Sequence, residues 1–252
     1  MILVALKHEY RAIQPLLKGR EVLRAEAFKY ERGSIAGVPV AAAVTGVGKS
    51  RAAARCAELV DRERPWGIIL AGFAGGLRDD LATGDLVIAG EIREVGAAGR
   101  AGEARWTAAR ESLEAAARIT IPGHRVVPGI LAAVDRVYLT PAEKRELALA
   151  SGADAVDMES SAVARAAAGI PFLCARAILD EVDFPLPIDF SRTLAPSGEP
   201  SPWRIFKEVA RRPAKLFRTL DLGTRARIAL QTLRAALPQL AEAMGMQRPT
   251  GG

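Results

Sequence analysis

Short apolar runs alternate along the chain with alanine-rich stretches whose apolar positions recur every three or four residues. Runs of this length and composition are typical of buried β-strands, and the recurring positions are typical of helices that cover a sheet. Strands that are apolar throughout need cover on both faces. The pattern therefore predicts an α/β protein, a three-layer α/β/α sandwich with a central mixed, mostly parallel sheet.

The boundaries of these segments set the expected elements. We expect strands at residues 2–6, 28–35, 38–44, 67–71, 85–95, 125–133, 136–139, 154–158 and 171–179. We expect helices at residues 9–17, 50–62, 107–118 and 160–168, and a further helix that begins at Pro141. The dipeptide Ala36-Gly37 is a turn signal, so the second and third strands are expected to form a hairpin.

The character of the chain changes after residue 184. Prolines interrupt regular structure between residues 185 and 202, and a basic segment follows. In that segment Pro238 is expected to kink a helix whose narrow apolar stripe is Leu230, Leu233, Leu237, Leu240 and Met244. We expect one α/β domain at residues 1–184 and, at residues 185–252, a Pro-rich segment and a basic helical tail packed on the same domain.

The net charge of +6 comes from the tail alone. Residues 201–252 contain 10 Lys and Arg against 3 Asp and Glu, whereas residues 1–200 contain 25 against 26. A neutral body and a tail without interleaved aromatics argue against nucleic acid as a partner. The apolar stripe of the tail is expected to pack on the domain or on a second subunit. The alternative is a peripheral contact of the tail with an anionic membrane.

Other features of composition narrow the class of protein. No apolar run reaches the roughly 18 residues of a membrane helix, and the first residues lack the basic region of a signal peptide. Cys56 and Cys174 lie in apolar surroundings and are expected to be buried, reduced thiols, which indicates a cytoplasmic location. With only His8 and His124, a zinc site is not expected, and the sequence implies no metal and no cofactor.

Acidic residues and glycines gather where the predicted strands end, which is where α/β sheets bind ligands. The segments are Leu6-Lys7-His8-Glu9, Thr45-Gly46-Val47-Gly48-Lys49, Ala71-Gly72-Phe73-Ala74-Gly75-Gly76, Val156-Asp157-Met158-Glu159-Ser160-Ser161 and Arg176-Ala177-Ile178-Leu179-Asp180. Each alone has an ordinary explanation as a tight turn or a helix cap, and His8 is interpreted as a solvated neighbour. Together they place Glu9, Glu159 and Asp180 at one edge of one sheet, which indicates a binding site.

In this order, and with Gly84-Asp85-Leu86-Val87, the segments resemble the purine nucleoside phosphorylase/nucleosidase superfamily. Residues 1–183 are most similar to its 5′-methylthioadenosine/S-adenosylhomocysteine nucleosidase branch. A second resemblance, to the hopanoid-associated phosphorylase group, rests on Val134-Asp135-Arg136-Val137, Thr140-Pro141-Ala142-Glu143-Lys144 and the basic tail. The resemblance implies a nucleoside phosphorylase-like catalytic domain, a purine nucleoside as the substrate and a homodimer.

The resemblance also implies roles for individual residues. Breaking a ribose–purine bond creates a cationic sugar and an anionic base, so it needs a proton donor and an activated nucleophile. Asp180 matches the acid that protonates the purine, and Glu9 matches the base that activates water. The residues that match substrate-binding positions are Gly48, Phe73, Ala74, Gly75, Val137, Tyr138, Met158, Glu159 and Arg176.

The chain departs from the nucleosidase pattern at three places. Phe73 stands where a small hydroxyl residue is common, and Val137 and Tyr138 stand where an aromatic residue usually stacks on the purine. Residues 96–105 are rich in Gly and Ala, which leaves the far end of the pocket undefined. These departures affect the choice of substrate more than the type of reaction.

The nucleophile is the remaining question. A phosphorylase usually binds phosphate with arginines on its glycine loops, but no arginine lies within residues 46–48 or 72–76. Glu9 would also repel phosphate. We therefore favour hydrolysis of an adenosine-type nucleoside, with phosphorolysis or a lipid-linked adenosyl substrate as alternatives. A non-catalytic nucleoside-binding domain is the alternative of a different class, although a pure binder has no need for all three acids.

Overall fold

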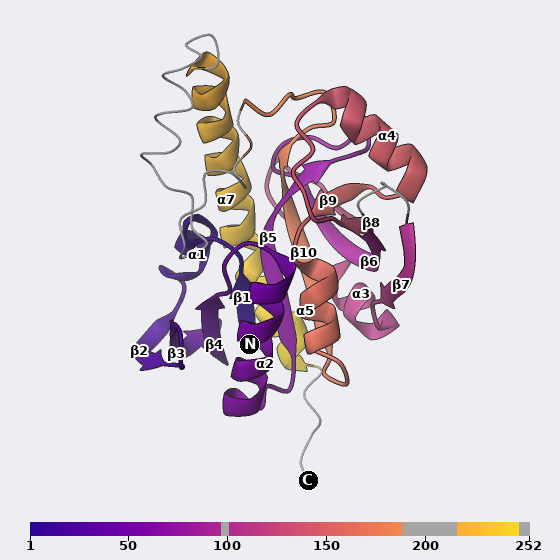
Figure 1. The fold of residues 1–252 in the computed structure, drawn as a ribbon. Coiled ribbons are helices and arrows are strands. Elements are labelled where there is room, and N and C mark those ends of the chain that lie inside the picture. Colours follow the sequence, from indigo (N-terminus) through magenta and orange to yellow (C-terminus); the bar gives the residue numbers. More distant parts are fainter. Residues whose placement is uncertain (97–100, 188, 190–215, 247–252) are drawn as a thin grey trace.

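The computed structural model describes residues 1–96, 101–187, 189 and 216–246 (Figure 1). The strands are β1 (Ile2–Val4), β2 (Lys18–Arg24), β3 (Lys29–Ile35), β4 (Val38–Val44), β5 (Ile68–Gly76), β6 (Leu86–Val95), β7 (Ala101–Thr107), β8 (Val126–Ala133), β9 (Ala155–Asp157) and β10 (Phe172–Asp180). The helices are α1 (Lys7–Ile13), α2 (Lys49–Glu63), α3 (Arg110–Ala116), α4 (Pro141–Ser151), α5 (Ser160–Ala166) and α7 (Leu216–Met246).

The strands form one mixed sheet, as the sequence predicts. Parallel pairs join β4, β1, β5 and β10, and a second parallel set joins β6, β8 and β9. Antiparallel pairs join β10 to β6 and β5 to β9, so these five strands close into a ring. The predicted hairpin is confirmed as β3 and β4. Within this ring β6, β8 and β9 run opposite to β5 and β10, so the strands do not all end at one edge of the sheet, contrary to what the sequence led us to expect.

Two hydrophobic clusters cover the two faces of the sheet. One contains side chains of α1, α3 and α7, such as Ile13, Ala116 and Leu233. The other contains side chains of α2 and α5, such as Cys56 and Val163. This is the expected helix–sheet–helix layering, and it buries apolar area on both faces of the strands. Cys56 and Cys174 are both free and buried, as predicted.

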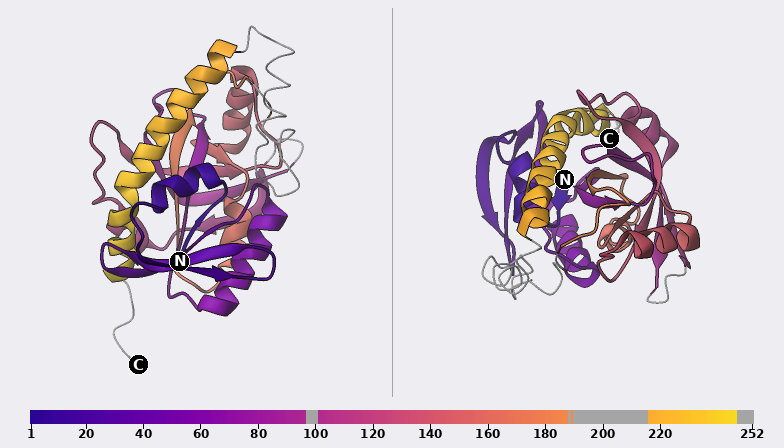
Figure 2. Two further views of the ribbon diagram at one scale, coloured as in Figure 1. Left: turned by 90° about the vertical axis from the view of Figure 1, so that its left-hand side faces the viewer. Right: turned by 90° about the horizontal axis from the view of Figure 1, so that it is seen from above.

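The C-terminal helix α7 runs along the whole body of the protein (Figure 2). Leu233, Leu237, Leu240 and Met244 of its apolar stripe are buried in the same cluster as α1 and the sheet, and the helix continues through Pro238. The stripe therefore belongs to the core. Within the described residues no helix, α7 included, is long and apolar enough to cross a membrane. The division of the chain at residue 184 stays a prediction.

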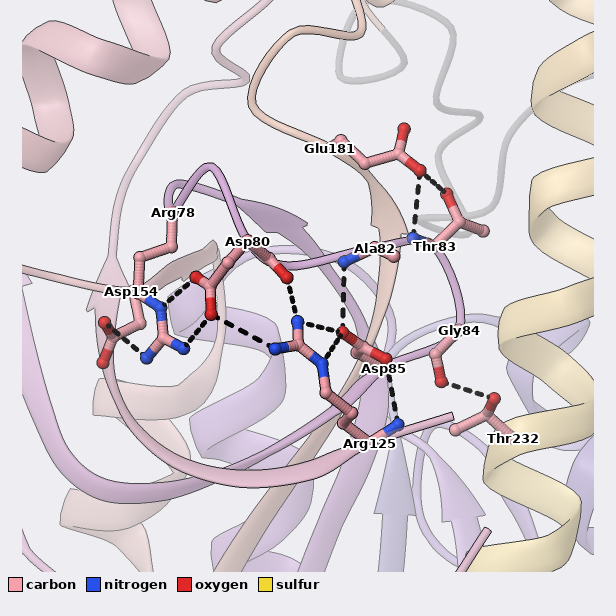
Figure 3. A network of polar contacts seen from close by, with 10 residues as sticks. All are labelled: Arg78, Asp80, Ala82, Thr83, Gly84, Asp85, Arg125, Asp154, Glu181 and Thr232. Atoms are coloured by element: carbon pink, nitrogen blue, oxygen red, sulfur yellow. Dashed lines mark hydrogen bonds and ion pairs between the residues drawn. The ribbon is translucent and has the colours of Figure 1, made fainter. Parts of the chain in front are cut away.

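A polar network fixes the turn before β6 (Figure 3). The carboxylate of Asp85 accepts hydrogen bonds from the backbone N–H groups of Ala82 (3.1 Å) and Arg125 (3.0 Å) and forms an ion pair with the Arg125 guanidinium (2.7 Å). Thr232 of α7 donates to the carbonyl of Gly84 at 2.7 Å. These contacts join α7 and the start of β8 to one rigid turn.

Several expected boundaries are wrong. The first helix ends at Ile13 rather than near residue 17, and β2 and β7 were not expected. Residues 136–139 form no strand; they pair with no other strand, and in this irregular segment the Arg136 guanidinium lies 4.0 Å above the Tyr138 ring. The strand predicted at 67–71 continues through the glycines to Gly76, because these residues pair with β10 on one side and β9 on the other.

Candidate active site

A cavity of about 490 Å³ is lined by residues at or close to the ends of β1, β5, β8, β9 and β10. Most of the side chains that line it are apolar. Of the predicted site residues, those that line it are Glu9, Phe73, Ala74, Gly75, Val137, Tyr138, Met158, Glu159 and Asp180. The cavity therefore brings together three carboxylates from distant parts of the chain. Gly48 and Arg176 lie beside it without lining it.

Glu9 is held rigidly by three backbone N–H groups. It lies in the first turn of α1, and its Oε2 accepts hydrogen bonds from Ala5 (2.9 Å) and Leu6 (2.8 Å). Its Oε1 accepts a hydrogen bond from Phe73 at 2.8 Å. Burial raises the pKa of Glu9, while the positive charge of Arg176 and these N–H groups oppose the rise. The glycine-rich end of β5 thus orients the carboxylate of Glu9 through the N–H of Phe73. The sequence did not suggest this role for Phe73.

Glu159 is the second carboxylate that a glycine segment orients. It lies at the N-cap of α5, and its Oε1 accepts a hydrogen bond from Gly48 at 2.9 Å. Gly48 has φ of +98°, which favours glycine, and this backbone conformation lets its N–H meet the carboxylate. Burial and the neighbouring charge of Asp157 raise the pKa of Glu159. The N–H of Gly48 was expected to contact the substrate, but in the structure it orients the carboxylate of Glu159.

Asp180 is the last residue of β10 and is buried at the cavity wall. It forms an ion pair with Lys144 of α4, which also lines the cavity. Burial raises the pKa of Asp180, and the charge of Lys144 opposes the rise. Lys144 was not predicted as a site residue, because an isolated lysine in a helical segment normally lies in solvent.

Arg176, which was expected to contact the substrate, lies behind the cavity wall. Its guanidinium is completely buried and forms an ion pair with Asp157, whose carboxylate also accepts a hydrogen bond from the hydroxyl of Ser160 (2.6 Å). The expected help to Glu9 is therefore electrostatic: the charge of Arg176 lowers the pKa values of Glu9 and Glu159 from the levels that burial would produce. One buried cation thus serves three buried carboxylates.

Parts of the cavity wall were not foreseen. The half-buried His8 lines the cavity, and its ring centroid lies 6.0 Å from that of Phe73. Burial lowers the pKa of His8. The helix α7 supplies a further part of the wall: Thr219, Leu222, Gly223 and Ala226. No local signal in the sequence shows that a helix that begins 36 residues after the end of β10 returns to the site.

Comparisons with known proteins agree with this architecture. The profile of the Phosphorylase superfamily matches residues 1–211, and the chain belongs to this family. A 5′-methylthioadenosine/S-adenosylhomocysteine nucleosidase of Geobacillus kaustophilus is 31% identical over 200 residues, which cover 71% of this chain and 83% of the relative. The protein of that name from Shewanella sediminis is 28% identical over 193 residues, covering 69% and 82%.

A solved structure shows the same fold. The 5′-methylthioadenosine/S-adenosylhomocysteine nucleosidase of Colwellia psychrerythraea, in complex with adenine, matches with a TM-score of 0.71 and 21% identity over 95% of this chain and 94% of that chain. The predicted fold class and the family resemblance are therefore confirmed.

Proposed function

We propose that the protein is a nucleosidase, an N-ribosyl hydrolase that cleaves the N-glycosidic bond of an adenosine-type nucleoside and releases the purine. The observation that carries this proposal is the convergence of Glu9, Glu159 and Asp180 on one largely apolar cavity. Buried carboxylates are costly, and a site that only binds a nucleoside has no need for three of them. The names of the nucleosidase relatives support the same reaction.

Each carboxylate has a part that its surroundings support. Glu9, oriented by three N–H groups, accepts a proton from the attacking water. Glu159 accepts hydrogen bonds from the ribose hydroxyls, and these strengthen as the sugar becomes cationic. Asp180 gives a proton to the purine nitrogen as the C–N bond breaks, and the electron pair of that bond stays on the purine. The apolar walls exclude other water and fit the purine and the sugar.

Water is the nucleophile that the charges favour. Of the cations that follow the glycine segments, Lys49 is paired with Glu94 (3.0 Å) and Asp135 (2.8 Å), and Arg78 is paired with Asp80 (2.7 Å). Lys144 and Arg176, near the cavity, are paired as well. A phosphate dianion placed beside the carboxylate of Glu9 would be repelled strongly in this low-dielectric cavity.

An assay of free base tests the proposal. Methylthioadenosine, adenosylhomocysteine, inosine and an adenosine with an alkyl substituent are incubated with the protein, with and without inorganic phosphate. We expect release of adenine that does not depend on phosphate. Strict phosphate dependence would make the protein a phosphorylase, and the absence of release from every nucleoside would reject the enzyme.

The α7 wall favours a second, narrower candidate: a substrate whose sugar carries an apolar substituent. Leu222 and Ala226 line the cavity, and Phe217 and Leu220, earlier on the same helix, are 80% and 62% exposed. If the substituent lies along α7, the alkyl nucleoside in the same panel will have the highest kcat/KM. Three further expectations stay predictions: the homodimer, the cytoplasmic location and the alternative of a membrane contact. Sedimentation without vesicles tests the homodimer, and sedimentation with anionic vesicles tests the membrane contact.

A further inference from the structure

The most unusual group near the cavity is a buried lysine. The side chain of Lys144 is 1% exposed, although lysine is almost never fully buried unless it is paired. Its ammonium forms an ion pair with Oδ2 of Asp180 and donates hydrogen bonds to the backbone carbonyls of Glu181 (2.7 Å) and Phe184 (3.1 Å). The three protons of the ammonium are therefore occupied, so Lys144 acts on a substrate only through Asp180.

The carbonyls that bind Lys144 are themselves held in place. Oε1 of Glu181 accepts hydrogen bonds from the backbone N–H of Thr83 (3.0 Å) and from its hydroxyl (2.8 Å), as Figure 3 shows. Arg225 of α7 forms an ion pair with Glu181 and lies 4.2 Å above the ring of Phe184. The segment that receives the ammonium is thus fixed from two sides, by the turn before β6 and by α7.

We propose that Lys144 is a positioning residue for the acid of the reaction: it holds Oδ2 of Asp180, directs Oδ1 toward the purine and stabilises the carboxylate that remains after proton transfer. The inference rests on the proposed function of Asp180. In the step concerned, the O–H bond of Asp180 breaks and an N–H bond forms on the purine, while the C–N bond gives its electron pair to the base. The new carboxylate is then neutralised by Lys144, and Asp180 takes a proton from solvent before the next turnover.

The electrostatic sign makes the inference testable. A cation next to a carboxyl group lowers its pKa, typically by about 1–3 pH units, and here it opposes the rise that burial causes. Without Lys144, the pKa of Asp180 will be higher, and the acid will be weaker. The alkaline limb of the activity profile, where Asp180 loses its proton, will therefore move to higher pH.

Other charged groups surround the pair and are unchanged in Lys144→Met and Lys144→Arg, so a difference between these two variants reports on the charge at position 144. Those close to the pair are Glu181, Asp183 and Arg225. Those elsewhere on the wall or directly behind it are His8, Glu9, Arg136, Tyr138, Asp157, Glu159 and Arg176.

The experiment compares Lys144→Met and Lys144→Arg with the wild-type protein in the base-release assay between pH 5 and pH 10. For Lys144→Met we expect kcat to fall by at most about tenfold and KM to stay within about threefold of the wild-type value. The alkaline limb is expected to lie about 1–3 pH units above that of the wild-type protein. Lys144→Arg keeps the charge and is expected to restore the position of the limb. Arg145→Met, which removes an exposed cation of the same helix, serves as the matched control and is expected to keep the wild-type profile.

Two further measurements separate this inference from protein stability and from the proposed function. The double variant Lys144→Met/Asp180→Asn removes both charges of the pair, and it is expected to be no slower than Asp180→Asn alone. A carbon NMR titration of the Asp180 carboxyl in wild type and Lys144→Met needs no substrate and is expected to show a higher pKa in the variant.

An unmoved alkaline limb together with an unmoved carboxyl pKa in Lys144→Met would overturn the inference, as would a double variant slower than Asp180→Asn. Absence of turnover in the wild-type protein would reject the proposed function, and the NMR result would still decide the role of Lys144.

Discussion

Replacing Gly72 by alanine is expected to disrupt the candidate site from within the sheet. Gly72 lies opposite Arg176 in the register of β5 and β10, and a Cβ atom there would meet Nη1 of Arg176 and lie 2.8 Å from Oε1 of Glu9. Both neighbours are buried, so neither side chain has free space to move into. The glycine is required here by the close approach of these two side chains.

The cost follows from the contacts that must change. Relief of the clash displaces Oε1 of Glu9 from the N–H of Phe73, a hydrogen bond to a charged group worth about 1.5–3 kcal/mol. Overpacking a core adds about 1–3 kcal/mol. The free energy of unfolding should therefore fall by about 2.5–6 kcal/mol. A misplaced catalytic group commonly lowers kcat by about 100-fold.

Thermal unfolding and base release measure the two effects of Gly72→Ala. Gly96→Ala is the matched control, because Gly96 has no atom within 4 Å of an added Cβ and no positive φ. We expect the control to keep the wild-type Tm and kcat. A Gly72→Ala protein that behaves like the control would refute the assignment of Glu9 and Arg176 to this packed arrangement.

Three other variants or conditions test separate parts of the structure. Glu9→Gln removes the proposed base and is expected to lower kcat by about 10²–10⁴-fold, which the base-release assay measures. It is also expected to lower the Tm, measured by calorimetry, because the amide NH₂ of glutamine must face a backbone N–H that donates to the carboxylate in the wild-type protein. Since burial raises the pKa of Glu9 and its ionised form is the base, the acidic limb of kcat should lie above the ordinary glutamate value of 4.5; a limb at or below that value would contradict this role. Leu237→Ala in the buried stripe of α7 should cost about 2–5 kcal/mol in denaturant unfolding while kcat changes little, and a large fall in kcat with unchanged stability would show that the helix serves the site rather than the core.

The fold could be predicted where strands are apolar throughout. β1, β4 and β10 are buried on both faces, so their sequences have few polar residues and their boundaries were found within two residues. β2 was missed because its residues are almost all exposed and include four charged side chains. Its strand conformation comes from pairing with β3, which is a tertiary contact that a local pattern does not record.

The carboxylates of the site could be predicted because each ends a strand or follows one closely, which is where α/β sheets bind ligands. The partners that orient them could not. Gly48 and Phe73 donate to Glu159 and Glu9 across 111 and 64 positions of the chain. Lys144 meets Asp180 only because α4 packs beside the end of β10, and a lysine in a helix carries no sign of such a contact.

The two halves of α7 have different neighbours, and this gives them different freedom to vary. Substitutions between Thr219 and Ala226 alter the wall of the cavity, whereas those between Ala229 and Met244 alter the packing of the core. Relatives with the same architecture can therefore acquire new preferences for the sugar substituent through the first part of this helix, while the later part keeps the residues whose replacement would destabilise the fold.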